Sequence, residues 1–270
     1  MRAKSGTCKL CLANSKLCAS HIVPEFCYEY NGPSNARSAC YVELPTSGLL
    51  REMVVQIGHR EHLLCGRCEQ LVGKYEDAFA RYWGASPELK APTPAGAEVV
   101  LHGAPYHEVK LFVLSVFWRA SVSTLFGREM HLGSYGEKLR RIVLDGDRVS
   151  EQQYLLVAKL ILGEGGLPLS GYVDTPLLVR HDHIWRYRMA FACCEWHVIM
   201  CDHPLPQSLH RLAPSVMEDG DIHLIAVPSH ELPALKHVRR LIQVRMNASP
   251  VGAETGNREE RRLASNDGKG

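Results

Sequence analysis

Near its start the chain carries Cys8-Lys9-Leu10-Cys11, and the same cysteine spacing recurs at Cys65-Gly66-Arg67-Cys68. Two Cys-x-x-Cys pairs supply four thiolates, which is enough to close a tetrahedral zinc site with no open position. The alternatives are incidental free thiols or a redox Cys-x-x-Cys motif, and the redox motif is typical of a helix start in a βαβ unit. The sequence around the two pairs does not indicate such a unit. The spacing therefore predicts a structural Zn²⁺ site with these four cysteines as ligands.

Between the two pairs lies Ser20-His21-Ile22-Val23-Pro24, which holds the candidate catalytic side chain of this segment. Pro24 disfavours a helix, so we expect His21 on an extended strand. A neutral imidazole accepts a proton from water near pH 7, as a general base must. The alternative is a structural histidine of a hairpin, bonded to a backbone carbonyl.

Together with Leu64-Cys65-Gly66-Arg67-Cys68-Glu69, these motifs resemble the treble-clef HNH nuclease superfamily. Within it they are most similar to an HNH-like group of bacterial proteins in which Glu follows the last Cys. The resemblance covers about residues 5–82. It implies a zinc knuckle, a β-hairpin and a helix, with a general-base histidine at the position of His21 and a divalent cation beside it.

The match to the active-site pattern is incomplete. Ser20 stands where active members carry their first catalytic metal ligand, and a hydroxyl is a poorer ligand for a hard cation. Glu69 stands where the family has its final His ligand, and a carboxylate there suits Mg²⁺ or Mn²⁺. The middle Asn of the motif has no clear counterpart before Cys65. The resemblance therefore carries the fold signature more completely than the catalytic one.

Carboxylates near His21 complete the candidate site. We expect His21 and Glu69 as catalytic residues, and Glu69 with Glu76 as ligands of a catalytic cation. Glu61 would join them in an acidic cluster. The alternatives are that Glu69 lies in the first turn of a helix, where its carboxylate is stabilised by the positive end of the helix dipole, and that Glu76 pairs with a basic residue on a solvated surface.

Composition describes an ordinary globular chain of 270 residues, with 46% hydrophobic residues and a net charge of +2. Residues 1–82 hold ten Lys and Arg against eight Asp and Glu, which leaves +2 and lowers the expectation of a broad nucleic-acid surface. The N-terminus lacks an apolar run, and no apolar stretch approaches the ~20 residues of a membrane span. Ten cysteines without an export signal indicate a reducing compartment. We expect a cytoplasmic location and no membrane partner.

The predicted fold class is α+β, with four segments along the chain. An HNH-like zinc module (1–83) is followed by a linker rich in Pro (84–105), a helical and antiparallel-β region (106–246) and a disordered tail (247–270).

Periodicity predicts the individual elements. We expect helices over Gln70–Trp83, with Leu71, Tyr75, Ala78 and Tyr82 on one face, and over Val109–Leu125, Ser150–Leu162 and Ser229–Met246. Strands are expected over Leu49–Gly58, Leu177–Arg180, Ile184–Cys201 and Asp221–Val227. His181-Asp182-His183 reads as a hairpin turn rather than a metal ligand set. Trp118-Arg119 reads as a core pair, with a functional role as the alternative.

Two functions follow from these residues. The first is a metal-dependent endonuclease that hydrolyses nucleic-acid phosphodiesters, DNA rather than RNA, with bacterial defence as an analogy. The second is a catalytically degenerate zinc module that binds nucleic acid or a protein. A protein partner would bind through residues 106–246. His21 and Glu69 favour the first function, whereas Ser20 and the missing Asn favour the second.

Overall fold

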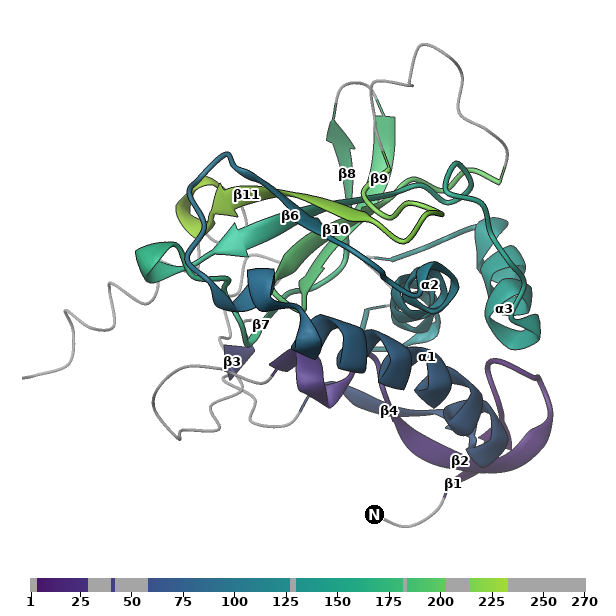
Figure 1. Cartoon of the computed structure of the whole chain (residues 1–270). Coiled ribbons are helices and arrows are strands. Elements are labelled where there is room, and N and C mark those ends of the chain that lie inside the picture. Colours follow the sequence, from purple (N-terminus) through teal and green to yellow (C-terminus); the bar gives the residue numbers. More distant parts are fainter. Residues whose placement is uncertain are drawn as a thin grey trace, which may run out of the picture.

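In the part of the chain that the structure describes, three α-helices lie between a three-stranded and a six-stranded β-sheet (Figure 1). The computed structural model describes residues 4–28, 40–41, 58–126, 130–181, 184–202 and 214–232. The predicted α+β class is confirmed, and all but two of the strand pairings are antiparallel.

The smaller sheet has the order β1-β2-β4 and belongs to the cysteine-bearing segment. Its strands are β1 (Lys4–Thr7), β2 (Asn14–His21) and β4 (Arg60–Cys65). A short 3-10 turn, η1 (Glu25–Tyr28), follows β2. The expected strand at 49–58 falls outside the described residues except for its last position.

Helix α1 (Gly66–Ala85) begins directly after β4 and packs on this sheet. Its buried face consists of Cys68, Val72, Tyr75, Phe79 and Trp83, which repeat at helical spacing. The face that we expected, through Leu71 and Ala78, was wrong by about one position. The reason is that the larger aromatic side chains, Phe79 and Trp83, point into the core.

The larger sheet has six strands in the order β5-β11-β6-β10-β9-β8. They are β5 (Glu98–Leu101), β6 (Leu156–Leu162), β8 (Leu177–His181), β9 (Ile184–Phe191), β10 (Cys194–Val198) and β11 (Ile222–Pro228). Strands β6 and β11 pair in parallel. A further short parallel pair joins β3 (Cys40–Tyr41) to β7 (Tyr172–Val173).

Helix α2 (Tyr106–Val122) is the central element, and it is buried almost all round, as its sequence predicts. Helix α3 (Tyr135–Asp145) packs beside it and ends at Gly146, whose φ of 67° is the left-handed conformation that glycine adopts readily. Phe79 of α1 stacks on Phe112 of α2 at 4.1 Å between ring centres. One continuous cluster of buried residues therefore runs from the cysteine-bearing segment into the six-stranded sheet.

Three expectations need correction. The helix expected over Ser150–Leu162 is a turn followed by strand β6. Ser150 and Gln153 do contact each other as in a capping box, at 3.4 Å, but Tyr154 has a φ of 46°, which ends the turn before a helix forms. The strand expected over Ile184–Cys201 is a hairpin, because Ala192 and Cys193 have φ of 50° and 55°.

The third correction concerns the linker. Residues 84–105 contain a 3-10 turn, η2 (Pro87–Lys90), and β5, which forms an edge of the larger sheet. Whether residues 1–83 and 106–246 are separate domains stays a prediction.

The remaining expectations fall in two groups. The antiparallel pairing of β8 with β9 and the strand near 221–227 are confirmed, whereas Asp182 and His183 of the expected turn lie outside the described residues. The structure also contains two short 3-10 turns, η3 (Glu164–Gly166) and η5 (Ser229–Glu231). Of the helix expected over Ser229–Met246 and the tail expected at 247–270, all residues from 233 onward lie outside the described part of the chain.

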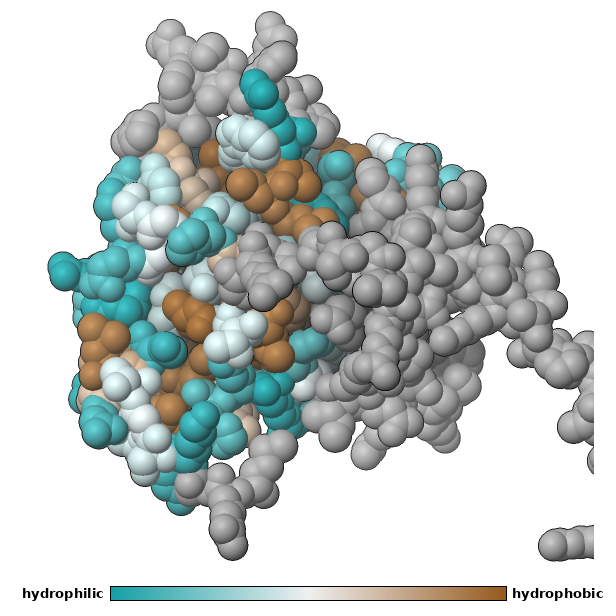
Figure 2. Space-filling view, turned by 180° about the vertical axis from the view of Figure 1, so that it is seen from behind, coloured by the Kyte–Doolittle hydropathy of each residue, from teal (hydrophilic) through white to brown (hydrophobic). Residues whose placement is uncertain are grey.

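The described part of the chain contains no helix that is both long and apolar enough to cross a bilayer. On the face shown in Figure 2, hydrophobic residues lie in separate groups among hydrophilic ones.

Candidate metal centre

Four cysteine sulfurs converge where the small sheet meets α1. Cys8 and Cys11 come from the connection between β1 and β2, while Cys65 ends β4 and Cys68 lies in the first turn of α1. Their sulfur atoms all lie within 4.8 Å of one another. The Sγ atoms of Cys11 and Cys65 are 3.8 Å apart. A tetrahedral site with Zn–S bonds of about 2.3 Å has S–S edges of about 3.8 Å, whereas a disulfide bond is about 2.05 Å long.

The backbone around Cys8 forms a tight knuckle. Leu12 has a φ of 62°, and its N–H donates to the carbonyl of Cys8 at 2.9 Å. The N–H of Cys65 donates to the Sγ of Cys8 at 3.3 Å, which favours a negatively charged sulfur. Local turn geometry and the strand pairing therefore bring together the two pairs, which are far apart in sequence.

The protonation of these thiols is unequal. Burial raises the pKa of Cys8 and of Cys68. Burial acts on Cys65 in the same direction, but hydrogen bonds from the backbone and thiol of Cys68 and from the thiols of Cys11 and Cys8 outweigh it and lower the pKa of Cys65 to about 7. A bound cation would replace the remaining protons, because metal ligation requires thiolates. Cys18, in contrast, lies outside the four-sulfur cluster.

His21 ends β2 directly opposite Arg60 of β4. The Nε of Arg60 donates to the Nε2 of His21 at 2.6 Å, and its Nη2 lies 3.4 Å from the carboxylate of Glu25. Burial, followed by the charge of Arg60, lowers the pKa of His21. The imidazole is therefore neutral at pH 7, with its acceptor nitrogen held by a guanidinium.

Glu69 faces Ser20 instead of His21. Because successive strand residues point to opposite faces, Ser20 and His21 lie on different sides of β2. Burial raises the pKa of Glu69, and a hydrogen bond from Ser20 partly offsets this rise. The Ser20 hydroxyl also accepts the N–H of Leu64 at 3.1 Å. Within the described residues, the Oε1 of Glu69 is buried and has no hydrogen-bond partner.

Glu76 is occupied by a buried arginine of α2. The Nη1 of Arg119 lies 2.6 Å from the Oε1 of Glu76 and donates to the backbone carbonyl of His21 at 2.8 Å. Arg119 is only 2% exposed. The positive charge of Arg119 already neutralises Glu76. The alternative expectation, that Glu76 pairs with a basic residue, therefore matches this contact, although the partner is buried and not on a solvated surface.

Glu61 is occupied as well. Its two carboxylate oxygens accept hydrogen bonds from the Ser123 hydroxyl at 2.7 Å and from the N–H and hydroxyl of Thr124, each at 2.9 Å. Glu61, Glu69 and Glu76 do not form a metal-ligating group with His21, because the four cysteines are the only such group of three or more side chains that the described residues contain.

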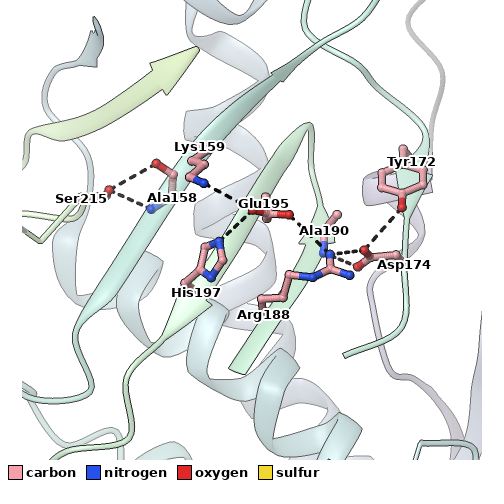
Figure 3. A network of polar contacts seen from close by, with 9 residues as sticks. All are labelled: Ala158, Lys159, Tyr172, Asp174, Arg188, Ala190, Glu195, His197 and Ser215. Atoms are coloured by element: carbon pink, nitrogen blue, oxygen red, sulfur yellow. Dashed lines mark hydrogen bonds and ion pairs between the residues drawn. The ribbon is translucent and has the colours of Figure 1, made fainter. Parts of the chain in front are cut away.

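A second cluster of ionisable residues lies on the larger sheet (Figure 3). Glu195 contacts His197 at 2.8 Å, Arg188 at 3.5 Å and Lys159 at 3.8 Å. Arg188 also pairs with Asp174, which is fully buried and accepts the N–H of Ala190. Sequence reasoning missed this cluster, although the charged residues that interrupt the apolar run 184–201 were a signal for it.

Searches of protein-family models, curated proteins and solved structures found no match to this chain.

Proposed function

We propose that the four-cysteine cluster binds one structural zinc ion. The support is the donor set itself: four sulfurs lie within 4.8 Å of one another, one pair of them at the 3.8 Å expected for a tetrahedral edge, and four thiolates leave no open position for substrate. Such a site would tie the β1–β2 connection to the start of α1 and so fix the strand that carries His21. Zinc content of one ion per chain, with charge-transfer bands typical of four thiolates after Co²⁺ substitution, would support it.

We further propose that the module is an HNH-like nuclease that hydrolyses phosphodiesters, with DNA preferred to RNA. The observation that carries this proposal is the pairing of His21, a neutral base, with Arg60, whose side chain is 36% exposed. A guanidinium is a bidentate phosphate binder. The two groups needed for attack on a phosphodiester, a base and an anion-binding cation, are thus in direct contact.

The proposed reaction begins when the scissile phosphate draws Arg60 away from His21. The Nε2 lone pair of His21 is then free to take a proton from water, and the resulting hydroxide attacks phosphorus. The bond to the leaving oxygen breaks, and solvent protonates that oxygen. Arg60 balances the charge that develops on the phosphate in the transition state.

Glu69 and Glu76 would be the ligands of Mg²⁺ or Mn²⁺, which would supply further positive charge. The donors fit such a cation only in part: Glu69 has one buried oxygen with no hydrogen-bond partner among the described residues and faces Ser20, while Glu76 is already paired with Arg119. Arg60 therefore has the leading electrostatic role in this proposal.

The test is cleavage of plasmid, single-stranded DNA and RNA by zinc-loaded protein, with and without Mg²⁺ or Mn²⁺. We expect His21→Ala and Arg60→Gln each to reduce the rate by about 10²–10⁴-fold. His223→Ala, which changes an exposed histidine of β11 bonded to Glu98, is the matched control and should leave the rate unchanged. Equal cutting by wild type and His21→Ala would refute the assignment of the base.

The pH profile gives a second readout. The protonated imidazole cannot accept a proton, so the rate should rise with pH as His21 loses its proton. Because burial and Arg60 lower the pKa of His21, this rise should be centred below about 6.5 and level off by neutral pH. A rate that still rises steeply above pH 8 would indicate another base.

The second candidate is a zinc module that binds nucleic acid or protein without catalysis. A specific observation favours it: Ser20, Glu61 and Glu76 are all engaged in contacts that hold elements together. Binding of nucleic acid by wild type without cleavage under any metal condition would support it. A protein partner for residues 106–246 remains a prediction, and co-purification from the source cell would test it.

A further inference from the structure

Strands β8 and β9 lie at one edge of the larger sheet, with β8 outermost (Figure 1), and β9 carries an exposed tryptophan. Trp185 is 57% exposed, whereas the other three tryptophans of the chain are buried at 8% exposure or less. Leu178, on the neighbouring strand, is 46% exposed. Trp185 and Leu178 thus form a small exposed apolar surface on neighbouring strands.

Arg180 lies directly opposite Trp185 in the strand register. The guanidinium carbon of Arg180 is 5.8 Å from the centre of the indole ring. Arg180 is exposed, and the described residues provide no carboxylate partner for it. A largely exposed indole and a guanidinium with no carboxylate partner among the described residues are thus presented side by side, in cation–π contact.

The root of the hairpin is held in place. Asp174 binds both Arg188 and the N–H of Ala190, which are residues of β9 (Figure 3). On the same face as Trp185, the hydroxyl of Tyr187 donates to the carbonyl of His131. The pair at the outer end is therefore preformed, and little conformational entropy is lost on binding.

We propose that this pair, with Leu178 beside it, binds single-stranded nucleic acid. One base stacks on the indole of Trp185, and the adjoining phosphate contacts Arg180. A single strand fits because its bases offer free π faces, whereas a duplex hides them except at its ends. The cation favours an anionic ligand over a neutral protein surface. The inference rests on the proposed function in that the ligand is nucleic acid, and it names the strand form that is bound.

The first measurement uses the full chain carrying His21→Ala, so that substrate is not cut. Since Trp185 is the one exposed tryptophan, iodide should quench its emission selectively. Oligothymidylate should quench the same emission and protect it from iodide. A blunt duplex of the same length should do so at least tenfold more weakly, and oligouridylate should behave like oligothymidylate because stacking does not need the sugar.

Binding affinity then comes from the anisotropy of a labelled oligothymidylate. We expect Trp185→Ala to weaken binding about tenfold and Trp185→Phe by less than about threefold, since phenylalanine still stacks. Arg180→Gln should weaken binding about threefold and lower the salt slope by about one. Ile225→Ala is the matched control: Ile225 is 48% exposed on β11, which two strands, β6 and β10, separate from β9 in the sheet, and its loss should change nothing.

The outcomes separate this inference from the proposed nuclease. Binding that depends on Trp185 upholds the hairpin site even if the wild type cuts nothing. Cleavage that needs His21 but is indifferent to Trp185→Ala, together with unchanged binding, overturns the hairpin site and leaves the nuclease intact. Concentration-dependent self-association that Trp185→Ala abolishes, with no oligonucleotide quenching, would assign the surface to a second copy of the chain and refute the proposal.

Discussion

Two groups of ionisable side chains converge in this molecule, and their charges are balanced in different ways. On the larger sheet, Asp174, Arg188 and Glu195 alternate in sign and neutralise one another, with His197 and Lys159 at one end. At the small sheet, four cysteines meet. Deprotonation of these thiols adds only negative charge, so a bound cation would be needed to balance the charge of the cluster. A converging group made of a single acid type therefore indicates a metal, whereas a mixed group is complete by itself.

The largest expected effect comes from breaking the cysteine group. Cys68→Ser should lose zinc and unfold the small sheet with α1, because structural zinc contributes about 10–16 kcal/mol of apparent binding free energy, as much as a whole domain's stability. Metal analysis and circular dichroism would check this. Cys18→Ser, outside the cluster, is the control and should retain zinc. A folded, zinc-free Cys68→Ser protein would contradict the comparison.

The next effect comes from breaking the mixed group. Asp174→Ala leaves Arg188 buried without its closest carboxylate and should lower the free energy of unfolding by about 3–5 kcal/mol. Asp174→Asn should cost less, because the amide oxygen still accepts the N–H of Ala190. Urea unfolding measures both variants. A loss of less than ~1 kcal/mol for Asp174→Ala would show that this network contributes little to stability.

Lys110 of α2 sharpens the comparison as a third case. It is 1% exposed, and its ammonium donates to the carbonyl of Ser150 at 3.2 Å. Burial lowers the pKa of Lys110 to about 7, although Glu151 and Glu218 oppose the shift. With neither a metal nor a bonded carboxylate, this charge is only partly compensated. Lys110→Met should therefore stabilise the protein by roughly 1–4 kcal/mol at pH 7.

The pH dependence of stability should change with the same substitution. Between about pH 7 and the unfolded pKa of about 10.4, the unfolded state binds more protons at Lys110 than the folded state. The contribution of Lys110 to the free energy of unfolding therefore rises with pH across this window, and Lys110→Met should remove that rise. Urea titrations from pH 6.5 to 10 measure it. Parallel curves for wild type and variant would refute the shifted pKa.

The cysteine site was predictable from sequence because ligand spacing is local chemistry. Each Cys-x-x-Cys pair occupies one turn, so only the meeting of two turns had to be inferred. The contacts of Glu61 and Glu76 were not predictable, since their partners, Thr124 and Arg119, lie 63 and 43 residues away in sequence. Which acids stay free for a hydrolytic cation depends on how α2 docks, and periodicity alone does not encode that docking.

The secondary-structure predictions were wrong where local sequence signals and long-range strand pairing disagreed. The capping-box contact of Ser150 with Gln153 forms, yet the residues that follow gain more by joining β10 and β11 as strand β6. The apolar run after Ile184 concealed a two-residue turn at Ala192 and Cys193, because neither residue is a usual turn former. Burial on both faces made strand and helix indistinguishable by pattern in these stretches.

The position of Arg119 has a consequence for anyone who wishes to transplant the cysteine-bearing segment into another protein. A fragment that ends with α1 would lose the guanidinium bonded to Glu76 and to the His21 carbonyl, and it would present Phe79 to water without its stacking partner Phe112. A portable unit must therefore extend at least through α2 to Thr124, and shorter grafts should aggregate even when fully loaded with metal.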